Sequence, residues 1–144
     1  MKRVIIVLVS AALFVGCNPK DDNDDAITIA DIIGSWTLTH EEGYEVYGDE
    51  REDWSRNAGW LSVYTFNSDN TGIHNYNDGH PGEWSFTWQY TASNQNLSVV
   101  SDGDPDRPHL YVIEILQPSL LVIIRHVTQG DYEYYQKSKY AKSN

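Results

Sequence analysis

The chain has 144 residues, and its 21 acidic residues against 10 Lys and Arg give a formal net charge of −11 at neutral pH. This balance argues against nucleic-acid binding, because phosphate backbones are held by clusters of Lys and Arg. It equally opposes electrostatic attachment to anionic lipid. The length suits one domain, and no internal repeat is visible.

The N-terminus has the layout of a secretory signal. Lys2 and Arg3 precede an apolar run over residues 4–15 that ends at Gly16. A permanent transmembrane helix needs about twenty apolar residues, so this run is too short to span a bilayer. We therefore predict a signal peptide over residues 1–16, the alternative being a buried N-terminal strand or helix. Its removal takes away Lys2 and Arg3, which changes the net charge to −13.

Residues 17–27 predict a tether. Cys17 is the only cysteine, so no intramolecular disulfide is possible. Pro19 and the acidic run over residues 21–25 cannot bury apolar area, which favours an extended, disordered segment. We expect no metal site in this run, because it lacks the defined backbone geometry of a calcium loop.

The remaining residues, 28–140, predict an all-β domain. Residues 28–33 suggest one helical turn with Thr28 as N-cap and Asp31 three residues on. Period-two patterns then predict eight strands, at 35–46, 60–67, 71–77, 83–91, 96–101, 109–116, 120–127 and 131–138. Turn residues fill most of the short breaks, which favours an eight-stranded antiparallel meander. Closing it into a β-barrel would remove the exposed edges, although the pattern leaves open whether the last strand closes onto the first.

Two kinds of strand can be distinguished. Trp84, Phe86 and Trp88 alternate with polar residues in strand 83–91, so they share one face. Strands 109–116 and 120–127 are apolar at both parities, which predicts that both of their faces are covered. One face would line the barrel, and the other would need the N-terminal turn, a long loop or a partner.

The segment Phe14-Val15-Gly16-Cys17 resembles the lipobox of bacterial lipoproteins. The resemblance implies that Cys17 is diacylated, that the peptide is cut just before it, and that the membrane is bound through this lipid anchor. Lys20-Asp21-Asp22 is similar to the signal that sends some Gram-negative lipoproteins to the outer face of the outer membrane. An ordinary solvated linker is an equal reading of those three residues.

The order of features over residues 28–138 resembles the lipocalin-like domains of small bacterial lipoproteins. Gly34-Ser35-Trp36 matches the Gly-x-Trp motif of lipocalins, a hairpin follows at 64–72, and the tyrosine-rich segment 132–135 comes near the end. The resemblance implies a lipocalin-like barrel that holds an apolar small molecule. It also implies that Arg125, the only arginine in the last two strands, packs over Trp36 and closes the barrel floor.

Aromatic residues are the candidate ligand contacts. Those that could line a cavity, with tyrosines supplying the polar groups, are Trp36, Tyr64, Tyr76, Trp84, Phe86, Trp88 and Tyr111. Two alternatives are that they form the core, or that they lie outside as a platform for a sugar or a protein.

Metal and catalytic sites are not predicted. A hairpin about Pro118 would bring His109 close to His126, but three or four convergent ligands are needed for zinc. The acids of residues 102–106 suggest a solvated turn, because Arg107 stands where a calcium loop needs Gly. Glu114 would be a surface charge if it faces outward, and an acid of raised pKa if it faces inward. No nucleophile motif is present, so we expect neither an enzyme nor a cofactor.

Two functions remain. The first is a non-enzymatic, lipid-anchored binding lipoprotein of the cell envelope that holds a small hydrophobic or amphipathic ligand in the barrel. The second is an accessory subunit or inhibitor with a filled barrel. Its protein partner would cover strands 109–127 and the charged loop expected over residues 47–59.

Overall fold

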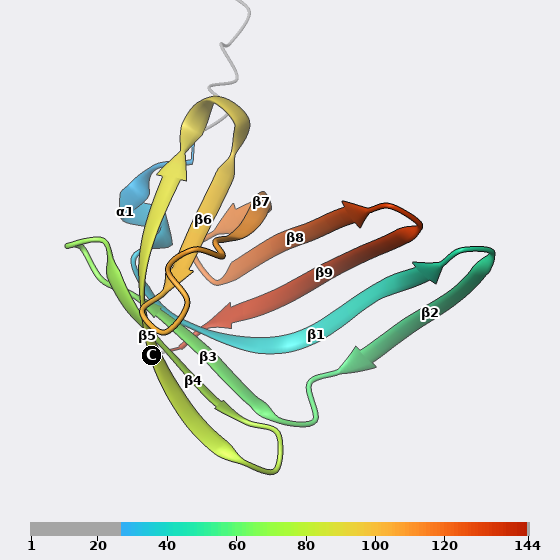
Figure 1. Ribbon diagram of the computed structural model, residues 1–144. Helices are drawn as coiled ribbons and strands as arrows, with labels where there is room; N and C mark the ends of the chain where they lie inside the picture. The colour runs from blue at the N-terminus through green and yellow to red at the C-terminus, as the bar shows by residue number, and fades with distance from the viewer. Residues whose placement is uncertain (1–26, 144) are drawn as a thin grey trace, which may run out of the picture.

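The computed structural model describes residues 27–143, whose elements are shown in Figure 1. The predicted signal peptide, Cys17 and all but the last residue of the tether therefore lie outside the described residues. The elements are α1 (Ile29–Ile32), β1 (Gly34–Tyr47), β2 (Glu50–Asn57), β3 (Leu61–Phe66), β4 (Thr71–Asn77), β5 (Pro81–Thr91), η1 (Ala92–Asn94), β6 (Asn96–Ser101), β7 (His109–Gln117), β8 (Leu120–Gln129) and β9 (Tyr132–Lys142). No helix within residues 27–143 is long and apolar enough to cross a membrane.

Eight strands close into an antiparallel β-barrel, as predicted. Apart from β2, each strand pairs with the next along the chain, and β9 pairs back onto β1. This last ladder runs from Trp36 opposite Lys142 to Tyr47 opposite Tyr132. It decides the closure that the sequence pattern left open, and it removes the edges that an open sheet would expose.

Along one edge, β1 pairs with two different strands. Gly34 to Thr37 pair with β3, whereas His40 to Tyr47 pair with β2. The far half of β1 joins β2, β9 and the end of β8 in a four-stranded extension, which leaves the barrel on the right of Figure 1. We call this extension the tongue, residues 40–57 and 124–139.

The strand β2 corrects the prediction of a charged loop over residues 47–59. Its residues are exposed or half-buried along the whole strand, so neither face carries the apolar alternation that marks a strand in a sequence. Eight residues of β2 instead pair with β1, from Asn57 opposite His40 to Glu50 opposite Tyr47. Backbone hydrogen bonds with a neighbouring strand, rather than burial of a face, hold this segment in place.

Buried and exposed side chains do alternate in β5, as the sequence pattern of residues 83–91 predicted. In β5 the side chains of Phe86, Trp88 and Tyr90 are buried, whereas the residues between them are exposed. The tight turns use residues that tolerate a positive φ, such as Asn70 at 66° between β3 and β4 and Gly130 at 60° between β8 and β9.

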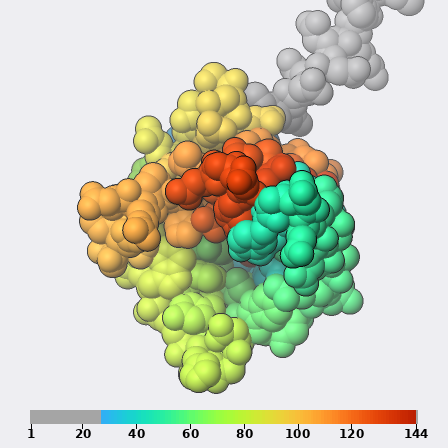
Figure 2. All heavy atoms as spheres, turned by 45° about the vertical axis from the view of Figure 1, so that its right-hand side comes forward, coloured from blue at the N-terminus to red at the C-terminus, as the bar shows by residue number. Residues whose placement is uncertain are grey.

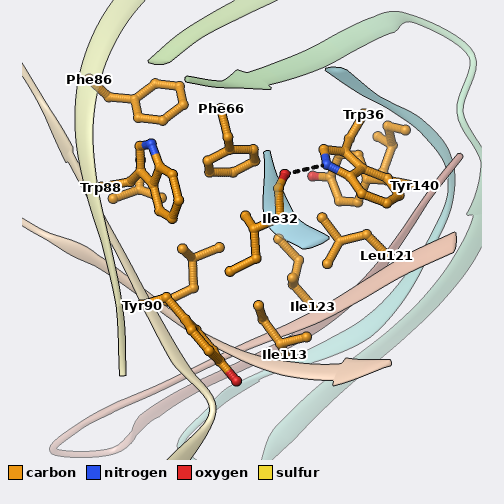
Figure 3. Packing of buried hydrophobic residues seen from close by; sticks show 13 residues of the cluster. Ile32, Trp36, Phe66, Phe86, Trp88, Tyr90, Ile113, Leu121, Ile123 and Tyr140 are labelled. Carbon is orange, nitrogen blue, oxygen red and sulfur yellow. Dashed lines mark hydrogen bonds between the residues drawn. The ribbon is translucent and has the colours of Figure 1, made fainter. Parts of the chain in front are cut away.

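The helix α1 closes one end of the barrel. Thr28 and Asp31 form the predicted capping box, and Ile32 is completely buried among the core side chains (Figure 3). The indole Nε1 of Trp36 donates to the backbone oxygen of Ile32 at 2.8 Å, which ties the helix to the start of β1. The core cluster consists of Ile32, Trp36, Leu38, Phe66, Phe86, Trp88, Tyr90, Leu97, Val99, Ile113, Leu121, Ile123 and Tyr140.

The outer face of β7 departs from expectation. Leu110 is 61% exposed and Val112 is 41% exposed, so no element within residues 27–143 covers them. The N-terminal turn and the loops of the described residues therefore leave this part of the face open, and its coverage by a partner stays a prediction. The inner face does agree, because Ile113 is completely buried.

Candidate functional site

The predicted ligand-lining aromatics fill the barrel instead of surrounding a cavity. Trp36, Phe86 and Trp88 are buried in the core. Tyr64 lies 5.8 Å from Phe86 and 5.9 Å from Tyr140, measured between ring centroids. The space lined by Tyr64, Tyr111 and Tyr140 offers about 0 Å³ to a water molecule. The interior is packed at this level, and the expectation of an apolar ligand inside the barrel stays a prediction.

The other predicted ligand-contact residues, Tyr76, Trp84 and Tyr111, lie nearer the end of the barrel opposite α1. Trp84 meets the Tyr64 ring edge-on at 6.1 Å, and Tyr76 stacks on His74 at 5.6 Å. Burial raises the pKa values of Tyr64 and Tyr111. Tyr64 and Tyr111 lie where the apolar core ends and the polar side chains begin.

The open end of the barrel is ringed by the turns at 48–49, 78–80, 102–108 and 130–131. Figure 2 shows the surface hollowed between these turns. We call this hollow the mouth. One side of its wall is the inner face of the tongue, which carries charged and aromatic side chains. In β1 a register shift between Leu38 and His40 brings Glu41 and Glu45 onto this face.

A buried carboxylate organises the tongue side of the mouth. Glu41 is only 3% exposed, and its Oε1 accepts from Nε and Nη2 of Arg56, both at 2.7 Å. The Nε2 of Gln136 donates to Oε2 of Glu41 at 2.7 Å, and the Tyr134 hydroxyl donates to Oε1 of Gln136 at 2.7 Å. This chain of bonds links β2, β1 and β9 and holds the Tyr134 side chain in one position.

Arg125 lies in the mouth and not at the barrel floor. Its guanidinium is 5.7 Å from the centre of the Tyr134 ring, whereas the ammonium of Lys142 is 4.9 Å from the Trp36 ring. The predicted contact between Arg125 and Trp36 is therefore wrong. The register explains it, because Arg125 pairs with Gln136 while Trp36 pairs with Lys142 at the closed end.

The charge of Arg125 has no partner. No carboxylate within residues 27–143 forms an ion pair with it, and the hollow that it lines is otherwise formed by Val127, Tyr132 and Tyr134. Its positive charge acts on Tyr64, Tyr111 and Tyr134, because it opposes the rise in the pKa values of these hydroxyls. A half-buried guanidinium among hydroxyl groups is suited to bind an anion, since its five N–H donors match a carboxylate or phosphate.

Two hollows lie on either side of Tyr134. One has a volume of about 270 Å³ and is lined by Glu45, Glu52, Trp54, Arg56 and Tyr134. The other has a volume of about 280 Å³ and is lined by Arg125, Val127, Tyr132 and Tyr134. Both hollows combine aromatic walls with a few charged groups.

The histidines do not form a metal centre. His126 faces outward and bonds Glu133 at 2.8 Å, whereas His109 lies against the inner Tyr111 ring, so the predicted approach of these two histidines is wrong. No group of three or more potential metal ligands occurs in the part of the chain that the structure describes.

His74 lies beside a serine near the middle of the barrel wall. Its Nε2 lies 2.9 Å from the Ser62 hydroxyl, but its Nδ1 has no hydrogen-bond partner. Burial lowers the pKa of His74 to about 4, which makes it a poor base. Glu114 faces outward and pairs with Lys137 at 2.5 Å, so it is not the inward acid that a hydrolytic site would need.

Sequence reasoning missed most of the mouth. Glu41 and Gln136 were not singled out from the sequence, and Arg56 was assigned only to the charged loop over residues 47–59. The tyrosine-rich segment near the end of the chain was the one available signal for Tyr134. The glycine of the Gly-x-Trp motif is at Gly34, whose φ is 127°, a conformation that glycine adopts readily.

Known proteins share this architecture. A family model described as a lipocalin-like domain matches residues 32–123. A lipocalin-like protein from Bacteroides uniformis ATCC 8492 is similar in structure with a TM-score of 0.52 and 16% identity, covering 78% of this chain and 99% of that chain. An uncharacterized protein from Bacteroides eggerthii DSM 20697 gives a TM-score of 0.47 at 10% identity, covering 77% of this chain and 98% of that chain. No curated protein matches. Since the family model covers more than half of the sequence, the chain belongs to the lipocalin-like domain family.

Proposed function

We propose that this protein is a non-enzymatic binding protein that takes a small amphipathic ligand in the mouth of the barrel. The lipocalin-like fold suggests a small-molecule binding or accessory role. The filled interior favours a ligand held above the core. Its apolar part would lie against Tyr132, Tyr134 and Val127, and its anionic group would meet Arg125.

The observation that carries this proposal is the unpaired charge of Arg125. Removing a guanidinium from water costs free energy unless a partner compensates for it. Within residues 27–143, Arg125 has the Tyr134 ring beside it and a hollow of about 280 Å³ in front of it. An anionic ligand would supply the missing partner and gain a charge-assisted hydrogen bond of about 1.5–3 kcal/mol.

A fluorescent anion can test this proposal. 1-Anilinonaphthalene-8-sulfonate combines a sulfonate with aromatic rings, and its emission rises on binding to apolar surfaces. We expect saturable binding to the purified chain, and a Kd at least tenfold weaker in Arg125→Met, in line with that free energy. Arg51→Met is the matched control, because Arg51 pairs with Asp53 and lines neither of the two hollows. Equal binding by wild type and Arg125→Met would refute the proposal, provided both variants are folded by circular dichroism.

We further propose that the protein acts at the cell envelope, attached to the outer membrane through lipid on Cys17. The support is the lipobox-like segment that precedes Cys17 and the single cysteine of the chain. In the exporting bacterium, Cys17→Ser should move the protein from the membrane fraction to the soluble fraction. Retention of the variant in the membrane fraction would contradict the anchor.

A protein partner is the second candidate function, supported by the exposed outer face of β7. Leu110 and Val112 are neighbouring apolar side chains on this face, and such surfaces are favoured in interfaces when they are contiguous. Crosslinking of the intact lipoprotein in cells would detect a partner. Loss of a crosslinked species in Leu110→Ser would support this function, whereas an unchanged pattern would count against it.

A further inference from the structure

The two hollows beside Tyr134 carry opposite charges. Glu45 and Glu52 lie on one side of the ring, and Arg125 lies on the other. We propose that the ligand of the mouth is a short zwitterionic peptide, whose ammonium group binds between Glu45 and Glu52 and whose carboxylate binds Arg125. This inference rests on the proposed function and specifies its ligand class.

The acidic side holds two carboxylates that face each other. Glu45 and Glu52 are direct partners in the antiparallel ladder between β1 and β2, and like charges opposite each other destabilise a sheet. Neither forms an ion pair with a cation within residues 27–143. A bound ammonium group would relieve this repulsion, because it would lie between two negative charges.

An aromatic wall completes the acidic side. The Trp54 ring lies against Gly43, where an added Cβ would be 2.7 Å from Cζ2 of the indole. The absence of a side chain at Gly43 therefore gives the ring its place on the inner face of the tongue. The Arg56 guanidinium already lies 5.2 Å from the centre of this ring, so Trp54 contributes an apolar wall and not a free cation-binding face.

The arginine on this side does not cancel the negative charge. Arg56 lines the same hollow, but its guanidinium is engaged with the buried Glu41 through two donors at 2.7 Å. The charges available to a ligand on this side are therefore those of Glu45 and Glu52.

A charged residue of each hollow affects the pKa of the Tyr134 hydroxyl. The pKa of Tyr134 is raised to about 12, chiefly by burial, while the charge of Arg125 lowers it and the charges of Glu41 and Glu45 raise it. The Tyr134 side chain thus lies between Glu45 and Arg125 and within range of both. It is also held by Gln136, so it can serve as a fixed apolar platform for the middle of a ligand.

The register sets the distance between the charges. Glu45 pairs with Tyr134, and Tyr134 pairs with Val127, so β1 and β8 are two strand spacings apart, which is about 10 Å. Arg125 lies two residues along β8 from Val127. An extended peptide advances about 3.3–3.6 Å per residue, so a tripeptide spans a comparable distance between its termini.

Three matched peptides test the inference by calorimetric titration of the purified full chain. These are alanyl-phenylalanyl-alanine with free termini, the same peptide acetylated at its N-terminus, and the same peptide amidated at its C-terminus. We expect the zwitterion to bind at least tenfold tighter than either capped form, equivalent to about 1.4 kcal/mol. In the double variant Glu45→Gln/Glu52→Gln, its affinity should fall to that of the acetylated peptide.

A charge-matched double variant, Glu83→Gln/Asp69→Asn, controls for net charge, because both residues are exposed and neither lines the two hollows. It should retain the preference for the zwitterion. Equal affinities of the free and acetylated peptides, or a preference that survives in Glu45→Gln/Glu52→Gln, would overturn the inference. If the peptides do not bind but the naphthalene sulfonate binds through Arg125, the peptide assignment fails and the proposed function stands. If neither binds, the proposed function itself fails.

Discussion

The two ion pairs of β2 offer a direct test of how burial sets the value of a charge. Arg56 bonds Glu41, whose side chain is 4% exposed, at 2.7 Å. Arg51 bonds Asp53, whose side chain is 64% exposed, also at 2.7 Å. The residue types of the cations, the strand and the distances are the same. The difference is the carboxylate, which is buried in one pair and hydrated in the other.

Arg56→Met should therefore destabilise the protein much more than Arg51→Met. Leaving a buried charge without its partner costs about 3–5 kcal/mol. The Arg56 side chain is itself 56% exposed, so solvent reduces the loss, and Gln136 still donates to Glu41. We expect about 2–3 kcal/mol for Arg56→Met. For Arg51→Met we expect about 1 kcal/mol or less, because exposed pairs contribute little.

Urea unfolding followed by far-ultraviolet circular dichroism measures both free energies of unfolding. This signal is preferable to tryptophan fluorescence, because Arg56 lies 4.6 Å from the Trp60 ring and its loss would alter the emission. The double variant Glu41→Gln/Arg56→Met should recover about 1–2 kcal/mol relative to Arg56→Met, since a neutral amide needs no cation. Equal losses for Arg56→Met and Arg51→Met, or no recovery in the double variant, would refute the reasoning.

Two further predictions concern the barrel wall. Gly72→Ala should lower the free energy of unfolding by about 1–3 kcal/mol through overpacking, because the new Cβ would lie 2.2 Å from the Phe86 ring and 2.6 Å from the backbone oxygen of Thr65. Gly59→Ala is the control and should be nearly neutral in the same urea titration, since nothing lies within 4 Å of its new Cβ. Similar losses in the two variants would contradict the packing argument. Burial lowers the pKa of His74 from 6.5 to about 4, so between these values the unfolded chain binds a proton that the folded chain does not, and stability falls as the pH falls through this window. His74→Phe should make the free energy of unfolding less dependent on pH between 6.5 and 4, and an unchanged slope would show that this group does not contribute.

The sequence was informative wherever a structural feature depends on nearby residues. The alternation of Trp84, Phe86 and Trp88 predicted which face of β5 is buried, because strand geometry places every second side chain on the same side. Thr28 and Asp31 predicted the start of α1, since the capping box closes within one turn. Together with the turn residues between strands, these local signals were enough for an eight-stranded antiparallel barrel of lipocalin-like type.

Features that depend on register could not be obtained in this way. The strand β2 lacks apolar alternation because neither of its faces is buried, and only pairing with β1 reveals it. Whether Arg125 or Lys142 covers Trp36 depends on the alignment of β8, β9 and β1, which a shift of a single residue would change. The outcome is that Arg125 lies in the mouth, where it faces an open hollow.

The division between sequence and tertiary structure follows from the range of the interactions involved. The sequence by itself determined the strand pattern, the inward faces and the family, since these rest on periodicity and short motifs. Only the tertiary structure decided that the aromatic side chains fill the barrel, because packing depends on how side chains from every wall meet. It also brought Glu41, Arg56, Gln136 and Tyr134 together in one mouth, since antiparallel pairing places residues from distant parts of the chain side by side.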